Sequence, residues 1–586
     1  MRRSHILAAA VAVAVSCGAS IAARAQDVPP GAIFRIDAGV HSGVVRRIAL
    51  SADQRTMVTS SFDKTIRVWN LPEGTLRSTF RVPAGDGFEG SGYAVALSPD
   101  GRTIAVGGWM KQMYVYLLDS GTGAVTGVLG PNPDIVNHVA FSPDGARIAA
   151  VFGNRNGVRL WDVAGRALLA EDSAYGRDTY VVDFAQDGSF VTGGYDGILR
   201  YYGADGVRQA GVPARSGTEI DDIDISPNGK RMAVSYSDRT GVDIYDTATR
   251  TWLISPELAA QGVGGISSVA WSSNGSHLYV GGQMKDKDGY YPTLRMPADI
   301  SAAPSVVLRT IDTVSDLEPY GAEDFAFSTT SPQLGIVRAE NFVMNVETNT
   351  AAMGSVGVSG IRASADGHRI LFASDYAGKQ RYVFDVDALS LTPVAADDTS
   401  LAEPDTSGLD LKALVSTYTP SFNGVSLAFD SGEWAMTVAA YPDRQRIILG
   451  SGWYVRNYDS AGTMQWRTAV AGWSWGVTTT RDGSAVIGAF GDGTIRWFRA
   501  SDGAVLLSLF ITRDAKRWIA WTPGGYYAAS PEGETLAGWQ VDKADQETPD
   551  YFPIAAFRAQ FNKPAVLKAI LRTLDEGKAA QEAHVN

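Results

Sequence analysis

Histidines and acids are the side chains of this sequence that could hold a metal ion or move a proton. The six histidines are scattered, none has a second ligand at metal spacing, and no His-Glu-x-x-His pattern occurs. We expect structural roles for all six, namely His5, His41, His138, His277, His368 and His584. Asp222 and Asp224 alternate with isoleucines, and with Asp221 we expect them to face solvent or to cap a turn. The sequence predicts no catalytic or metal-binding residue and no cofactor.

Tryptophan offers a second kind of chemistry, which is aromatic binding. Nine of the 14 tryptophans lie after residue 430. Trp473 and Trp475 alternate on one expected strand and therefore share a face. Aromatic side chains are enriched at binding hot spots, so these two are grouped as a candidate platform with Tyr441, Trp453 and Tyr454. Packing between neighbouring sheets is the alternative role for the same residues.

The elements that position these side chains repeat along the chain. A Ser-Pro-Asp/Asn-Gly turn begins at Ser98, Ser142 and Ser226, and looser copies occur elsewhere. Each turn stands between two short apolar runs, which is a strong β-hairpin signal because glycine reaches positive φ without a steric clash. A large apolar residue, often followed by Asp, closes each unit, as in Leu160-Trp161-Asp162. The sequence is therefore built from one recurring β unit.

A period of about 40 residues with a closing Trp-Asp resembles the WD repeat, in which each unit forms a four-stranded propeller blade. The resemblance implies that Asp63, Asp196 and Asp492 are the structural Asp residues of the family's tight turns. The family's Gly-His dipeptide is mostly missing, with His41 as its nearest equivalent. The histidine-based hydrogen-bond network of the family is therefore not expected to be general in this chain.

The predicted fold class is all-β: two β-propellers of WD-repeat-like four-stranded blades, about twelve to fourteen in total, with a short C-terminal helix. This number exceeds the four to eight blades of a typical ring, which requires two rings. It includes one degraded repeat between Phe384 and Tyr458. Prolines at 297, 304 and 319 indicate a connection between the rings. The expected organisation is a signal peptide at 1–25, an N-terminal propeller at 26–310, a C-terminal propeller at 311–545 and a tail at 546–586.

The first residues have the pattern of an export signal. Two arginines precede an apolar run at residues 6–15, and residues 23–25 read Ala-Arg-Ala, so the mature chain is expected to begin at Gln26. The predicted location is the periplasm, with secretion or a lipid anchor on Cys17 as alternatives. Removal of the leader would remove this single cysteine and with it any thiol chemistry. No transmembrane segment is expected in the mature chain.

The C-terminal tail has helical periodicity. Residues 564–583 are expected to form one amphipathic helix, with residues 33–36 completing a blade from the other end of the chain. The helix would pack on the last blade, anchored by Phe552, Phe557 and Phe561, or serve as a docking helix.

Residues 516–531 and 550–553 resemble the end of the propeller region in bacterial WD-repeat proteins that continue into a caspase-like peptidase domain. The resemblance covers about 425–580. The sequence ends at Asn586, so we expect no peptidase domain. What the resemblance then implies is a recognition role rather than proteolysis.

Charge limits the choice of partner. The formal net charge is −12 and there is no basic run, which opposes nucleic-acid binding. We expect a non-catalytic protein-interaction scaffold of the cell envelope, whose unidentified partner could be a caspase-like peptidase on a separate chain. The alternatives are a propeller enzyme of hydrolase or quinone-dependent type and a glycan- or cell-wall-binding propeller. The oligomeric state is not predicted.

Overall fold

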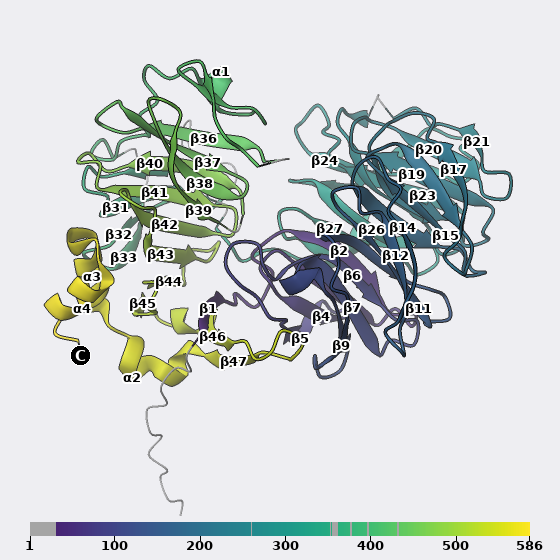
Figure 1. Ribbon diagram of the computed structural model, residues 1–586, viewed down its shortest axis with the longest axis horizontal. Helices are drawn as coiled ribbons and strands as arrows, with labels where there is room; N and C mark the ends of the chain where they lie inside the picture. Colours follow the sequence, from purple (N-terminus) through teal and green to yellow (C-terminus); the bar gives the residue numbers. More distant parts are fainter. Residues whose placement is uncertain are drawn as a thin grey trace, which may run out of the picture.

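The computed structural model describes residues 31–258, 261–351, 353, 361–375, 378–394, 398–430, 433–470 and 472–585. The expected leader, with Cys17 and His5, lies outside these residues. Figure 1 shows two lobes, a ring of sheets coloured purple to teal and a smaller green lobe. The expected all-β fold of four-stranded blades with short C-terminal helices is confirmed.

Seven four-stranded antiparallel sheets follow one another from Val45 to Val346, each running in sequence order from its innermost to its outermost strand. The first two contain β2 (Val45–Leu50), β3 (Thr56–Ser61), β4 (Ile66–Asn70), β5 (Thr75–Phe80), β6 (Ser91–Leu97), β7 (Thr103–Trp109), β8 (Val115–Asp119) and β9 (Val125–Leu129). The next two contain β10 (Val136–Phe141), β11 (Arg147–Phe152), β12 (Val158–Asp162), β13 (Leu168–Asp172), β14 (Thr179–Phe184), β15 (Phe190–Gly194), β16 (Ile198–Tyr202) and β17 (Arg208–Pro213). The last three contain β18 (Ile220–Ile225), β19 (Arg231–Tyr236), β20 (Val242–Asp246), β21 (Thr251–Ile254), β22 (Ile266–Trp271), β23 (His277–Gly282), β24 (Tyr291–Pro297), β25 (Ser305–Thr310), β26 (Val314–Tyr320), β27 (Asp324–Thr329), β28 (Leu334–Arg338) and β29 (Asn341–Val346).

The ring closes through its innermost strands. Each innermost strand packs beside that of the next sheet, and β26 of the seventh sheet packs beside β2 of the first. The first propeller therefore extends to Val346, beyond the boundary at residue 310 that was predicted from the sequence. The seventh sheet lacks the Ser-Pro-Asp-Gly turn and carries Pro319 inside β26, which is why its sequence looked like a connection.

The second lobe contains three stacked sheets. One contains β30 (Ile361–Ala363), β31 (Arg369–Ala373), β32 (Arg381–Asp385) and β33 (Ser390–Pro393). Another contains β36 (Ala435–Ala440), β37 (Arg446–Ser451), β38 (Tyr454–Asp459) and β39 (Met464–Ala469). The third has six strands, β40 (Ser474–Thr479), β41 (Ala485–Phe490), β42 (Thr494–Arg499), β43 (Val505–Ile511), β44 (Trp518–Trp521) and β45 (Tyr527–Ala529). The six-stranded sheet is in the middle, since β40 contacts both β30 and β36.

The described residues thus contain ten sheets of blade form, fewer than the expected twelve to fourteen. The degraded repeat expected between Phe384 and Tyr458 is not a four-stranded sheet. Its place is taken by a short helix and a hairpin, α1 (Leu411–Leu414), β34 (Ser421–Phe422) and β35 (Val425–Ser426). Ala363 bridges to Ala402, and Ala440 N–H donates to the Asp405 carbonyl, so this segment covers the open edges of β30 and β36.

The two ends of the described chain pair with each other. β1 (Ile33–Ile36) runs antiparallel to β46 (Ala537–Val541), which also pairs with β47 (Asp550–Pro553). This three-stranded sheet lies between the two lobes in Figure 1. It is tied to the ring, because Gln540 Nε2 donates to the Val82 carbonyl at 3.1 Å and Ala84 N–H donates to Asp542 at 2.8 Å.

The expected C-terminal helix is two helices, α3 (Pro564–Thr573) and α4 (Glu576–Glu582), after the single turn of α2 (Arg558–Phe561). Leu574, at φ 51°, ends α3, and the Asp575 carboxylate caps α4 by accepting from Lys578 N–H. The apolar face of α3 packs on β43 and β45 in the core of the second lobe. Of the two roles considered, packing on the last blade is the one observed. Among the described helices, none has the length and apolarity to span a membrane.

Candidate functional site at the mouth of the first ring

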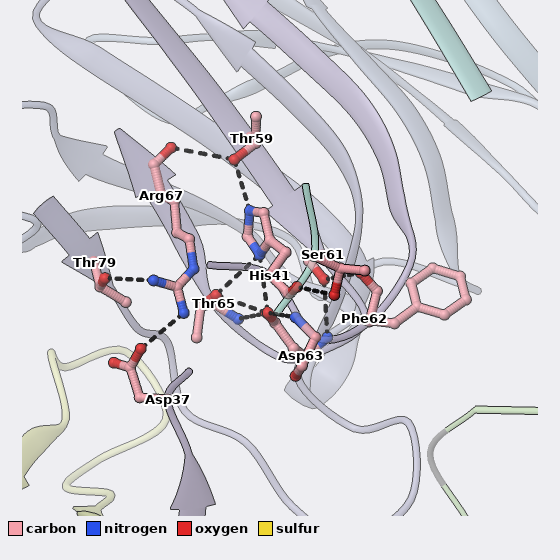
Figure 2. Close-up of polar contacts among 12 residues, drawn as sticks. Asp37, His41, Thr59, Ser61, Phe62, Asp63, Thr65, Arg67 and Thr79 are labelled. Carbon is pink, nitrogen blue, oxygen red and sulfur yellow. Dashed lines mark hydrogen bonds and ion pairs between the residues drawn. The ribbon is translucent and has the colours of Figure 1, made fainter. Parts of the chain in front are cut away.

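The first blade is held by a buried network around His41 (Figure 2). His41 Nδ1 lies 2.9 Å from an Asp63 carboxylate oxygen, and His41 Nε2 lies 2.7 Å from the Thr59 hydroxyl. The Trp69 indole N–H donates to the same hydroxyl at 3.0 Å. Burial lowers the pKa of His41, so the ring is neutral at pH 7 and donates from Nδ1 to Asp63. The histidine network of the WD repeat was not expected to be general in this chain. In this blade it is complete.

The fourth blade keeps the same network with a different residue. The Tyr175 hydroxyl lies 2.6 Å from Thr192 Oγ1 and 2.8 Å from the Tyr202 hydroxyl. Tyr175 precedes β14 as His41 precedes β2. A phenol therefore replaces the imidazole, and this blade has no Gly-His dipeptide before its innermost strand.

The three expected turn aspartates lie between the second and third strands of their sheets. In each case a carboxylate oxygen accepts from the backbone N–H two residues later, at 3.0 Å for Asp63, 3.2 Å for Asp196 and 3.0 Å for Asp492. These bonds hold the turn that flanks the start of the innermost strand.

Every innermost strand of the ring contains a β-bulge near its start, at its second residue in six strands and at its third in β6. A bulge re-aims one side chain relative to the ladder, and here it does so once in each blade. We call these seven positions the mouth residues: Arg46, Tyr93, Asn137, Tyr180, Asp221, Ser267 and Ser315. The Arg46 guanidinium carbon lies 5.6 Å from the ring centre of Tyr93 and 5.2 Å from that of Tyr180, on blades two and four. Side chains of separate blades therefore converge at this end of the channel.

An aromatic rim extends outward from the mouth. Tyr93 stacks on Phe62 with 4.5 Å between ring centres, and Phe62 meets Phe88 at 5.9 Å. On the other side Tyr180 stacks on Tyr195 at 4.1 Å. We define the aromatic rim as these rings together with Trp109, which lies 6.4 Å from Phe88. All of these rings are half-buried, which leaves part of each accessible.

Below the mouth, the channel holds a cavity of about 130 Å³ lined by five carboxylates. The acids come from three blades and face one arginine and one histidine: Asp183, Asp222, Asp224, Asp316 and Glu318, with Arg47 and His138. Arg47 makes ion pairs with Asp316 at 2.9 Å and Asp222 at 3.3 Å. The expectation that Asp221, Asp222 and Asp224 face solvent or cap turns was wrong, because β18 is an innermost strand whose alternate side chains point to the axis.

The channel acids connect neighbouring blades. Ile48 N–H donates to Asp316 at 2.8 Å, joining blades one and seven, and Ile225 N–H donates to Asp183 at 2.8 Å. Equivalent bonds around the ring are Val269 N–H to Asp222, Trp271 N–H to Asp224, Leu317 N–H to Ser268 Oγ and Val182 N–H to His138 Nδ1. We call these contacts the axial caps. They satisfy strand-edge donors that would otherwise face the channel unpaired.

Burial shifts the titration of these acids. It raises the pKa of Asp183 to about 7 and that of Asp316 to about 6, although Arg47 opposes the shift at Asp316. Burial and the neighbouring acids hold the pKa values of Asp224 and Glu318 well above the ordinary range. No group of three or more His, Cys, Asp or Glu among the described residues is arranged to hold a metal ion.

The aromatic platform predicted in the second lobe is only partly assembled. Trp473 is 54% exposed and its ring centre lies 6.1 Å from that of Trp475, the bulged residue of β40. Tyr454 lies between Arg456 and Arg467, and Trp453 is half-buried beside it. Tyr441 is fully buried in the core between two sheets and has no surface for a ligand.

Comparison with known proteins agrees with this architecture. The family model "WD domain, G-beta repeat" matches residues 38–70, in the first blade, and residues 123–162, which contain the last strand of the second blade and the first three strands of the third. Two segments of the first propeller are thus similar to the WD repeat. It is 28% identical over 182 residues to small ribosomal subunit protein RACK1 of Caenorhabditis elegans, covering 29% of this chain and 53% of the relative. It is 24% identical over 269 residues to pre-mRNA-processing factor 19 homolog 2 of Arabidopsis thaliana, covering 44% of this chain and 47% of the relative. The chain spans about half the length of these relatives, and the likeness to bacterial peptidase fusions stays a prediction.

His41→Ala is expected to lower the free energy of unfolding by about 2–4 kcal/mol, since it removes the buried hydrogen bonds to Asp63 and Thr59 and leaves a cavity in their place. Urea denaturation followed by tryptophan fluorescence measures the change. His368→Ala is the matched control, because His368 pairs with the 57% exposed Asp387 and its loss should cost less than about 1 kcal/mol. Equal losses in the two variants would contradict a structural role for the His41 network.

The channel acids predict an unusual pH dependence of stability. Their folded-state pKa values lie above the unfolded value, so the native state binds more protons and stability decreases as pH rises through 6 and 7. The contribution of these acids to stability therefore falls between pH 5 and pH 8, while the buried His41 and His138, whose pKa values are lowered by burial, act in the opposite direction. Asp183→Asn keeps an acceptor for Ile225 N–H without the charge. At pH 8 it should raise the melting temperature by about 2–4 °C for each kcal/mol of unfolding free energy that is recovered. At pH 5 it should change the melting temperature little.

Asp119→Asn is the control for this experiment. Asp119 is the last residue of β8 and its pKa is lowered by hydrogen bonds from Thr122, so its substitution should bring no gain at pH 8. A change in melting temperature on Asp183→Asn that is the same at pH 5 and at pH 8 would refute the assignment of a raised pKa to this channel acid.

Proposed function

We propose that this protein is a non-catalytic scaffold that binds other proteins through the mouth residues and the aromatic rim of its first ring. The observation that carries the proposal is the convergence of Arg46, Tyr93 and Tyr180 from separate blades at one end of the channel. Tyr, Trp and Arg are the residues most enriched at protein-binding hot spots. A closed ring also holds these side chains in place before binding, which reduces the entropy lost on association.

The rest of the channel supports binding rather than turnover. Four of the five cavity carboxylates, those of Asp183, Asp222, Asp224 and Asp316, already take part in the axial caps, and Asp222 and Asp316 also pair with Arg47. Glycan binding remains the second candidate, because the indole of Trp473 is exposed beside Trp475 and an exposed aromatic face can pack against a sugar ring.

The proposal includes a location and a partner class. The leader expected at residues 1–25 favours the periplasm, with secretion or a lipid anchor at Cys17 as alternatives. A caspase-like peptidase made as a separate chain is one candidate partner, on the resemblance of residues 516–531 to such fusions. The net charge of −12 favours a partner that is not strongly acidic.

Cross-linking in intact cells, followed by purification of the tagged chain from separated cell fractions, tests the binding surface and the location together. The double variant Tyr93→Ala/Tyr180→Ala should lose the cross-linked partner, since two rings at the mouth are removed. Trp473→Ala/Trp475→Ala is the matched control in the second lobe and should retain it. Loss of the partner only in the tryptophan variant would move the binding site to the second lobe, and recovery of the chain from the cytoplasmic fraction would contradict export.

A further inference from the structure

Arg46 is the one cation among the seven mouth residues, and it has no acceptor. Among the described residues, its guanidinium takes part in no ion pair within 4 Å and in no hydrogen bond. The adjacent Arg47 points into the channel and is fully committed to Asp222 and Asp316. Arg46 is instead held between the faces of Tyr93 and Tyr180. Such a guanidinium is oriented and partly dehydrated, yet its donors are unused.

The aromatic rim continues on both sides of Arg46. In one direction the contacts pass from Tyr93 to Phe62 and Phe88, and in the other from Tyr180 to Tyr195. On each side of Arg46, neighbouring ring centres are 4.1–5.9 Å apart. A ligand that ended at Arg46 would use only one side of the line. An extended chain that passes over Arg46 would use both.

We propose that the mouth binds an extended segment of a partner protein in which one internal Asp or Glu pairs with Arg46 and apolar side chains on both sides contact the aromatic rim. This inference rests on the proposed function and names the chemistry of the partner. A guanidinium offers two parallel N–H donors to a carboxylate, which makes the contact both strong and directional.

Asp221 limits how acidic the segment can be. It is the mouth residue of blade five, it is 7% exposed, and burial raises its pKa to about 6 despite the charges of Arg46 and Arg47. A second carboxylate arriving at the mouth would meet this acid. The site therefore favours a single acidic residue within an apolar segment over an acidic run.

A library of seven-residue peptides tests the inference on the whole chain. Each peptide is acetylated and amidated, has Asp, Glu, Asn, Gln or Lys at the centre, and has Leu, Val, Phe or Ala at the other positions. Fluorescence polarisation measures affinity. Peptides centred on Asp or Glu should bind on the order of tenfold more tightly than the matched Asn or Gln peptides, and Arg46→Gln should remove this difference.

Two further variants separate charge from folding. Arg55→Gln changes an exposed arginine at the opposite end of β2 and should leave the preference unchanged. Arg46→Lys keeps the charge without the planar pair of donors and should retain only part of it. Melting temperatures of all three variants show whether the ring is intact.

The outcomes separate this inference from the proposed function. Equal binding of acidic and amide peptides, lost in Tyr93→Ala/Tyr180→Ala, would overturn the role of Arg46 and leave the rim as a protein-binding surface. Tighter binding of peptides with a free C-terminal carboxylate and no internal acid would also overturn it, in favour of a chain end. Absence of binding by every peptide would refute the inference, and the cell cross-linking experiment would then decide on the rim itself.

Discussion

A propeller has to satisfy the backbone donors of strand edges that face its own axis. In the first ring this is done by side chains of the neighbouring blade, as when Asp316 accepts from Ile48 N–H and Asp183 accepts from Ile225 N–H. These axial caps close the ring between β26 and β2 without a strand shared by the two ends. This arrangement buries a group of carboxylates, and burial raises their pKa values. Among the residues that line the cavity, Arg47 is the one whose positive charge offsets them.

The same strands also provide the surface that we propose for binding. Each begins beside a turn, of which the one held by His41 and Asp63 is an example, and each then bulges at its second or third residue. The framework is thus constant, while the bulged residue varies from arginine to tyrosine, asparagine, aspartate and serine. The contacts that hold the ring together and those offered to a partner lie one residue apart, as Arg47 and Arg46 illustrate.

Local turn chemistry made much of the fold predictable from sequence. Ser-Pro-Asp-Gly turns and apolar runs gave the hairpins, and the turn aspartates fall where the WD resemblance implied. Pro319 made the seventh sheet look like a connection between the rings. The 74 residues from Phe384 to Tyr458 were predicted to contain a further blade, which the structure does not have. The acids of β18 were misplaced because alternation shows two faces but not which one lies on the axis. Each mouth residue stands five positions before its turn, as Tyr93 precedes Ser98, and that spacing could have revealed the site.

The central claim is that axial side chains, rather than a shared strand, hold the first ring closed. A double-mutant cycle on Arg47→Met and Asp316→Asn tests it, since these residues join blades one and seven at 2.9 Å inside the channel. Free energies of unfolding for the single and double variants should give a coupling energy of about 2 kcal/mol or more. A coupling energy below about 0.5 kcal/mol, the level expected for independent sites, would contradict the account.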